Sequence, residues 1–177
     1  MDRLLKGMFF SEIVEKVRIE KGTEGIVLLE KRMGESCSYS GFKDYPVEKH
    51  IKLLNEGINI IYGAISDEAY LAMGRYAWDT FINSPIGKTT IILYAHDFKR
   101  GISSIAKLWG LITNFGVRTY EDLGVSKIKV TIKEDPRPAK YIEGVLFQGA
   151  EYYKINATIL TTVIASENYE FLIEWQK

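Results

Sequence analysis

Cysteine and histidine are scarce in this chain of 177 residues. It contains one cysteine, Cys37, and two histidines, His50 and His96. A single cysteine excludes a disulfide within the chain and a zinc site built from several thiolates. Neither histidine has a second histidine or cysteine at ligand spacing, so no metal site is predicted. Low cysteine content is typical of a reducing compartment, and we expect a cytoplasmic location.

Net charge and long hydrophobic runs are also lacking. Lys and Arg together number 23, as do Asp and Glu, so the formal net charge is zero. Nucleic-acid-binding proteins usually carry a basic stripe, and none is visible, so no nucleic-acid partner is expected. The apolar run 91–95 is far shorter than the roughly 18–20 residues of a membrane span. Neither an integral membrane segment nor a signal peptide is therefore predicted.

Recognisable catalytic motifs are absent as well. There is no Gly-x-Ser-x-Gly element, and Cys37 has no general base within its own segment. The run Gly87-Lys88-Thr89 resembles the tail of a phosphate-binding loop, but Ile82 stands where that loop needs glycine. We therefore predict a binding protein and not an enzyme.

The first two thirds of the chain show helical periodicity. Ser11 is a candidate N-cap for the first helix, which Lys21-Gly22-Thr23 should end. The polar stretch 35–44 is expected to be a loop, and Pro46 suits the first turn of the helix that follows it. The expected helices start near residues 12, 24, 46, 67, 89 and 97.

The pattern changes from helical spacing to strict alternation near Val125. Residues 125–133 alternate between apolar and Lys or Thr side chains, which is typical of a half-buried strand, and 117–123 precede them as a hairpin partner. A helix with an apolar face from Ile142 to Tyr153 follows. Two further β-rich runs, 156–165 and 169–176, form a second hairpin.

These elements predict an α+β fold. A helical N-terminal layer should pack against a C-terminal four-stranded antiparallel sheet of β-β-α-β-β order. No repeat or linker interrupts the sequence, so we expect a single domain over 1–177, mainly helical over 1–113 and sheet-containing over 114–177.

Aromatic side chains crowd the predicted inner faces. Such residues at helical spacing usually belong to the core. A helical layer on a curved sheet can also leave an apolar cleft, which is the default small-molecule site. Both interpretations stay open. The residues expected to line a ligand pocket are Phe10, Trp78, Phe81, Trp109 and Phe115.

Several short motifs resemble the heme-nitric-oxide-binding (H-NOX) superfamily, which also includes 4-vinyl-reductase sensor domains and TRAPP tethering subunits. Lys6-Gly7-Met8 is similar to the H-NOX start. Met73-Gly74-Arg75 with Thr80-Phe81 is similar to its Gly-Arg…Thr-Phe helix, and 141–146 to the helix that packs on the sheet. Thr113-Asn114-Phe115-Gly116-Val117 resembles an element of an uncharacterised bacterial branch abundant in myxobacteria. The resemblance implies a pocket between helices and sheet, and a tendency to dimerise.

Two departures from H-NOX argue against heme as a cofactor. The stretch matching the helix that carries the axial histidine, 111–118, contains no histidine. The positions of the Tyr-x-Ser-x-Arg run that holds the heme propionates are occupied by Ile132, Glu134 and Pro136 in an ungapped overlay. The zinc ligands of the 4-vinyl-reductase branch would need more cysteines than the chain has. No cofactor is therefore expected.

Three hypotheses follow. The first is a heme-free sensor or carrier that binds an apolar small molecule or lipid in the helix–sheet cleft. The second is a TRAPP-like interaction module that works as a homodimer or adaptor. The third is a heme sensor with an atypical axial ligand, His96 or a tyrosine. An enzyme of unknown mechanism remains a further alternative.

Overall fold

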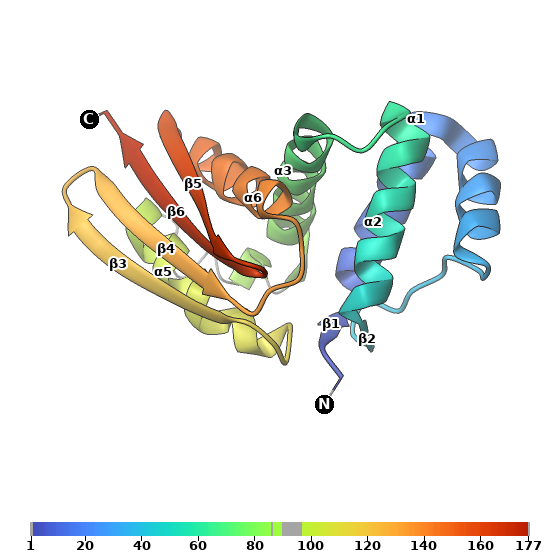
Figure 1. Ribbon diagram of the computed structural model, residues 1–177, viewed down its shortest axis with the longest axis horizontal. Coiled ribbons are helices and arrows are strands. Elements are labelled where there is room, and N and C mark those ends of the chain that lie inside the picture. Colours follow the sequence, from blue (N-terminus) through green and yellow to red (C-terminus); the bar gives the residue numbers. More distant parts are fainter. Residues whose placement is uncertain (1, 86, 90–96, 177) are drawn as a thin grey trace.

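The computed structural model describes residues 2–85, 87–89 and 97–176. A helical part and a four-stranded antiparallel sheet with its own helix form the molecule (Figure 1), which confirms the predicted α+β class. The helix expected to start at Thr89 lies almost entirely outside the described residues.

Helix α1 runs from Met8 to Met33 and is kinked where the sequence predicted a break. Gly22 has φ 64° and ψ −156°, a conformation that glycine adopts without steric cost. The expectation that Ser11 caps this helix is wrong, because Gly7 is the N-cap residue. The hydroxyl of Ser11 instead donates to the carbonyls of Gly7 and Tyr39.

A small two-stranded sheet precedes the next helices. Strands β1 (Leu4–Lys6) and β2 (Asp44–Pro46) pair antiparallel, with Leu4 opposite Pro46. Strands of three residues are too short to show periodicity, which explains why the sequence did not predict them. Helix α2 (Val47–Tyr62) then follows Pro46 as expected.

Two helices begin near residues 67 and 97, as the sequence predicted. Helix α3 (Asp67–Asn83) starts after Ser66, whose hydroxyl accepts a hydrogen bond from the amide of Ala69. Helix α5 (Phe98–Leu108) starts after Asp97, whose carboxylate accepts one from the amide of Arg100, and a short 3-10 turn η1 (Trp109–Leu111) continues it.

The main sheet has the strand order β3-β4-β6-β5 with every neighbouring pair antiparallel. The inward side chains of its central strands are fully or almost fully buried, with Val130 directly opposite Phe171. The predicted alternation is thus confirmed. The bounds are β3 Val117–Gly124, β4 Lys127–Lys133, α6 Ala139–Tyr152, β5 Ala157–Ala165 and β6 Asn168–Trp175.

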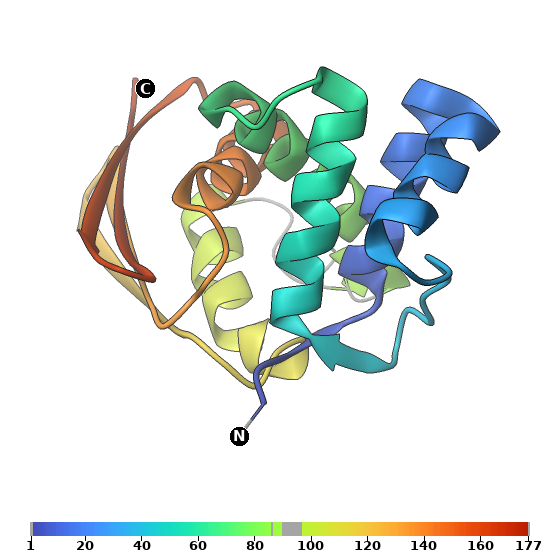
Figure 2. The same ribbon diagram turned by 45° about the vertical axis from the view of Figure 1, so that its right-hand side comes forward.

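The helices lie on one side of this sheet. Helices α5 and α6 lie against it, α3 packs on α6, and α1 and α2 lie farther away (Figure 2). One continuous apolar core spans these layers, from Phe10 on α1 to Phe171 on β6. At one end of the molecule Arg3 donates to Glu48 on α2 and to Glu167 in the β5–β6 turn.

None of the described helices is both long enough and apolar enough to cross a membrane.

Candidate ligand-binding cleft

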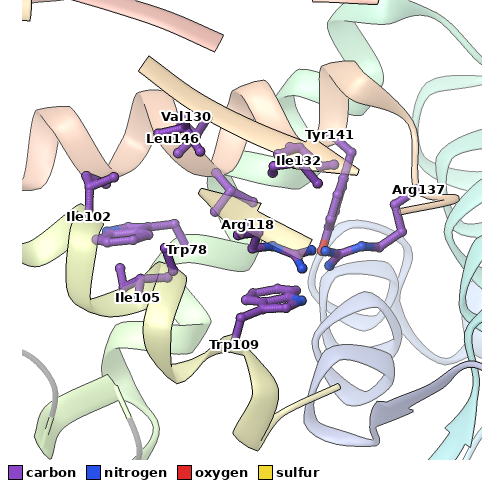
Figure 3. A pocket seen from close by; sticks show the side chains of 13 residues that line it. Trp78, Ile102, Ile105, Trp109, Arg118, Val130, Ile132, Arg137, Tyr141 and Leu146 are labelled. Atoms are coloured by element: carbon purple, nitrogen blue, oxygen red, sulfur yellow. The ribbon is translucent and has the colours of Figure 1, made fainter. Parts of the chain in front are cut away.

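Two small, largely apolar voids lie where α3, α5 and α6 meet the sheet. The larger measures about 60 Å³ and is walled by side chains from all three helices and from β4, including Trp78, Ile105, Leu146 and Ile132 (Figure 3). The second measures about 40 Å³ and shares Trp78, Ile105 and other lining residues with the first. A single buried water needs roughly 10–15 Å³, so the larger void has room for several water-sized groups.

Of the five aromatic residues predicted to line a pocket, three line the two voids and two do not. Trp78 and Trp109 line both voids, and Phe81 lines the smaller one. Phe10 and Phe115 line neither. Phe10 is fully buried among the rings of Tyr39, Tyr45 and His50, with centroids 4.9–5.3 Å from its own. Phe115 belongs to the buried core.

The cleft is narrower than the sequence led us to expect. The two voids together fall well below the roughly 300–1,000 Å³ of ordinary small-molecule pockets. The side chains of Trp78 and Trp109 reach into the space between helices and sheet, where they line both voids (Figure 3). A long fatty-acid chain would fit only after these side chains moved.

The cleft also contains a buried ionic cluster that the sequence analysis missed. Asp135, in the loop after β4, is fully buried and accepts from Nε, Nη2 and the backbone amide of Arg137 at 2.7–3.1 Å. Arg118 on β3 pairs with the same carboxylate. Both arginines line the larger void (Figure 3). This cluster of Arg118, Asp135 and Arg137 is referred to below as the arginine cluster.

A sequence signal for the arginine cluster existed. Arg118 shares the inward parity of β3 with Tyr120, and Arg137 lies between two prolines directly before α6. A charged residue at an inward strand position must find a buried partner, since an unpaired buried charge is very costly. The alternation along the strand did not reveal that Asp135 was that partner, because the conformation of the loop decides where the Asp135 side chain points.

Trp109 packs against both arginines. Its ring centroid lies 3.8 Å from the guanidinium carbon of Arg118 and 4.8 Å from that of Arg137. These cation–π contacts strengthen in a site that excludes water. Nη1 of Arg118 and Nε1 of Trp109 are buried without a hydrogen-bond partner among the described residues.

Burial and neighbouring charges shift the pKa values of Arg118 and Asp135 in the arginine cluster. Burial and the neighbouring charge of Arg137 lower the pKa of Arg118 to about 9, and the attraction of Asp135 only partly offsets them. Burial opposes ionisation of Asp135, but the charges and hydrogen bonds of Arg137 and Arg118 outweigh it and lower the pKa of this carboxyl. All three groups are therefore charged near neutral pH.

A second buried polar group adjoins the cleft. The hydroxyl of Tyr141 donates to Oε1 of Glu12 at 2.9 Å, and both side chains are buried. Burial raises the pKa of Glu12 to about 8, although Tyr141 and Arg137 act in the opposite direction. Burial, reinforced by the charge of Arg137, lowers the pKa of His50 to about 3. Near neutral pH, Glu12 is mainly protonated and His50 is neutral.

The residues of the cleft do not fit a heme. The described residues that line the two voids include no histidine, cysteine or methionine to serve as an axial ligand. Tyr141 also lines both voids, but its hydroxyl is engaged with Glu12. His50 packs between the rings of Phe10 and Tyr141 and lines neither void. The other candidate ligand, His96, lies outside the described residues.

The described residues also contain no group of three or more His, Cys, Asp or Glu side chains that could hold a metal ion.

Comparison with solved structures places the fold among H-NOX proteins. An H-NOX protein from S. oneidensis in the Fe(II)NO ligation state is similar with a TM-score of 0.80 at 17% identity, covering 98% of this chain and 100% of that one. The Fe(II) unliganded H-NOX protein from K. algicida gives 0.75 at 15%, covering 98% and 97%. An oxygen-binding H-NOX domain related to soluble guanylate cyclases gives 0.75 at 11%, covering 98% and 96%. At these identities the likeness shows the fold alone.

The family is shown by a different comparison. The family model described as "Protein of unknown function (DUF2378)" matches residues 1–176, so the chain belongs to that family. No curated protein matches it. The expected kinship with 4-vinyl-reductase domains, TRAPP subunits and a myxobacterial branch stays a prediction.

Proposed function

We propose that this protein is a heme-free sensory domain of H-NOX fold that binds a compact, mainly apolar molecule in the cleft between α3, α5, α6 and the sheet. Binding, and not catalysis, is its role. The observation that carries the proposal is the pair of small, apolar voids at this junction. Native interiors are close-packed, so two adjacent voids that share lining residues mark a place where a ligand can be accommodated.

The heme-free part of the proposal rests on the contents of the cleft. Trp109 occupies space there and packs against both Arg118 and Arg137. Seating a porphyrin would require displacing the indole ring and separating a buried ion pair, with no histidine on the described lining to bind the iron. Breaking a buried ion pair costs about 3–5 kcal/mol.

The size of the voids constrains the ligand. At roughly 10–15 Å³ for each water-sized group, the larger void holds about five non-hydrogen atoms without rearrangement. Because Trp109 lines both voids, a rotation of its ring would join them and admit a chain of a few more atoms. The proposed ligand is therefore short-chain or single-ring in size.

Neutral apolar probes test this proposal. Butan-1-ol, hexan-1-ol and benzene would be titrated while the melting temperature and the protein NMR spectrum are recorded. Stabilisation is expected, with shifts confined to residues around the cleft. Ala106 lines the larger void, so Ala106→Leu should fill it and weaken binding. Ala165→Leu adds the same side chain at an exposed position on β5 and should leave binding unchanged.

Absence of any cleft-centred shift in the wild-type protein would refute apolar ligand binding. Reconstitution with hemin tests the other half of the proposal. A colourless product is expected, and a Soret band that is lost on substitution of a cleft residue would overturn the heme-free assignment.

A further inference from the structure

The described charges around the larger void do not balance. Arg118 and Arg137 carry two positive charges, and Asp135 carries the single negative charge that pairs with both. Four other ionisable side chains interact with the cluster, and burial disfavours the charged form of each, so they are neutral near neutral pH: Glu12, His50, Tyr141 and Tyr169. One positive charge in a water-excluded site is thus left without a counter-charge among the described residues.

Arg118 is the arginine with unused hydrogen-bonding capacity. Arg137 uses Nε and Nη2 on Asp135 in a two-point contact. Arg118 reaches the same carboxylate through Nη2. Its Nη1 has no hydrogen-bond partner among the described residues, and only 5% of the side chain is exposed to solvent. A buried donor without an acceptor destabilises the folded protein, and more so when it is charged.

The surroundings of Nη1 are kept clear by a glycine. Gly116 has φ 75°, and a Cβ at this position would lie 2.9 Å from Nη1 of Arg118. On another side, the stacked ring of Trp109 holds the guanidinium plane in place. The group is therefore oriented, buried and without an acceptor among the described residues, and a carboxylate is the kind of anion that a guanidinium donor in this state favours.

We infer that the ligand of this cleft carries a carboxylate, which accepts a hydrogen bond from Nη1 of Arg118 while a short apolar body fills the adjoining void. The inference rests on the proposed function and names the chemical class of its ligand. A carboxylate supplies both the missing negative charge and a planar acceptor that matches a guanidinium. The walls around the rest of the void, such as Ile105, Val130 and Leu146, suit a hydrocarbon chain.

Paired acids and amides of equal size test the inference. Butyrate and hexanoate would be compared with butyramide and hexanamide by isothermal titration calorimetry on the full chain. Charge-assisted hydrogen bonds contribute about 1.5–3 kcal/mol, so hexanoate should bind about tenfold or more tightly than hexanamide. Arg118→Met should abolish this preference. Arg100→Met removes the same charge from an exposed side chain and should preserve it.

Arg118→Met leaves Asp135 paired with Arg137, so the variant retains a balanced ion pair. Arg118→Lys provides a second variant, which keeps the charge but loses the planar fork and should bind hexanoate with intermediate affinity. In the wild-type protein, the guanidinium NMR signals of Arg118 should shift with hexanoate and stay fixed with hexanamide.

These experiments distinguish failure of the carboxylate inference from failure of the proposed function. If hexanamide and hexan-1-ol bind in the cleft as tightly as hexanoate, the proposed function stands and the carboxylate inference is overturned, with water as the partner of Nη1. If no acid, amide or alcohol binds, both are overturned. If hexanoate binds equally well to Arg118→Met, another group recognises the anion and the inference is wrong.

Discussion

Gly74 on α3 and Gly144 on α6 let these two helices touch backbone to backbone. A Cβ on Gly74 would overlap the carbonyl of Tyr141, and a Cβ on Gly144 would overlap the carbonyl of Leu71. The contact is therefore reciprocal. This contact sets the distance between α3, which bears Trp78, and α6, which bears Tyr141, and both side chains line the cleft.

In Gly74→Ala, overpacking should cost about 3 kcal/mol, at the upper end of the usual penalty, because backbone atoms cannot swing aside. The gain in helix propensity from glycine to alanine, about 1 kcal/mol, leaves an expected net destabilisation of about 2 kcal/mol. Urea unfolding measures the difference. Gly110→Ala is the control, since nothing lies within 4 Å of its Cβ position. Equal stability of the two variants would contradict the close helix contact.

Asp135→Asn should be more destabilising than Arg118→Met. The first substitution leaves two buried guanidinium groups without a carboxylate, and loss of one partner from a buried pair costs about 3–5 kcal/mol. The second leaves one balanced pair, between Asp135 and Arg137. Chemical unfolding of both variants in the same buffer gives the order. The reverse order would show that Asp135 is not the shared counter-charge.

Stability should fall as pH rises from about 6.5 to 8, and Glu12→Gln should remove this fall. The pKa of Glu12 is raised from 4.5 to about 8, so the folded state holds a proton that the unfolded state has lost, and stability declines across that interval. His50, with its pKa lowered from 6.5 to about 3, makes stability rise with pH only up to about 6.5. The two slopes therefore oppose each other between pH 4.5 and 6.5.

Above pH 6.5 the effect of Glu12 is unopposed by His50. The decline over this interval of about 1.5 pH units corresponds to about 2 kcal/mol. Unfolding free energies at several pH values measure it. Glu15→Gln, at an exposed position on the same helix, serves as the control and should retain the decline. A wild-type profile that is flat from pH 6.5 to 8 would refute the protonated state of Glu12.

Tyr141→Phe should destabilise the protein by about 1–3 kcal/mol, because it removes the hydroxyl that donates to the buried Glu12. The hydrogen bond from Tyr141 lowers the pKa of Glu12, so its loss should raise that pKa further and extend the decline in stability to higher pH. Tyr152→Phe, at an exposed position on the same helix, is the matched control. Unchanged stability in Tyr141→Phe would show that the hydrogen bond contributes nothing.

The elements that the sequence predicted are those governed by local chemistry. Ser66 and Asp97 cap helices because their side chains accept hydrogen bonds from amides three residues later. The alternation over 127–133 marks a strand because one face of the sheet is buried. Ser11 misled the prediction, since a good capping residue also fits inside a first turn when the preceding chain is held in β1.

The candidate site was only partly predictable, because it depends on contacts distant in sequence. Trp78, Phe81 and Trp109 were found from helical spacing. The pairing of Arg118 with Asp135 joins strand β3 to the loop after β4, and no local pattern encodes it. The width of the cleft depends on the Gly74–Gly144 contact and on indole orientation, which are properties of packing. Both glycines lie in the motifs that resemble H-NOX, and the structure brings these motifs together.

The contacts of Arg3 have a mechanical consequence. They tie the β5–β6 turn to helix α2 at one end of the molecule, and the amide of Asp135 donates to the carbonyl of Glu167 in that same turn. The end of the sheet next to the arginine cluster is thus anchored to the helical half. If the halves move when the cleft fills, that anchored end is the natural pivot, and the largest displacement falls at the opposite end of the sheet.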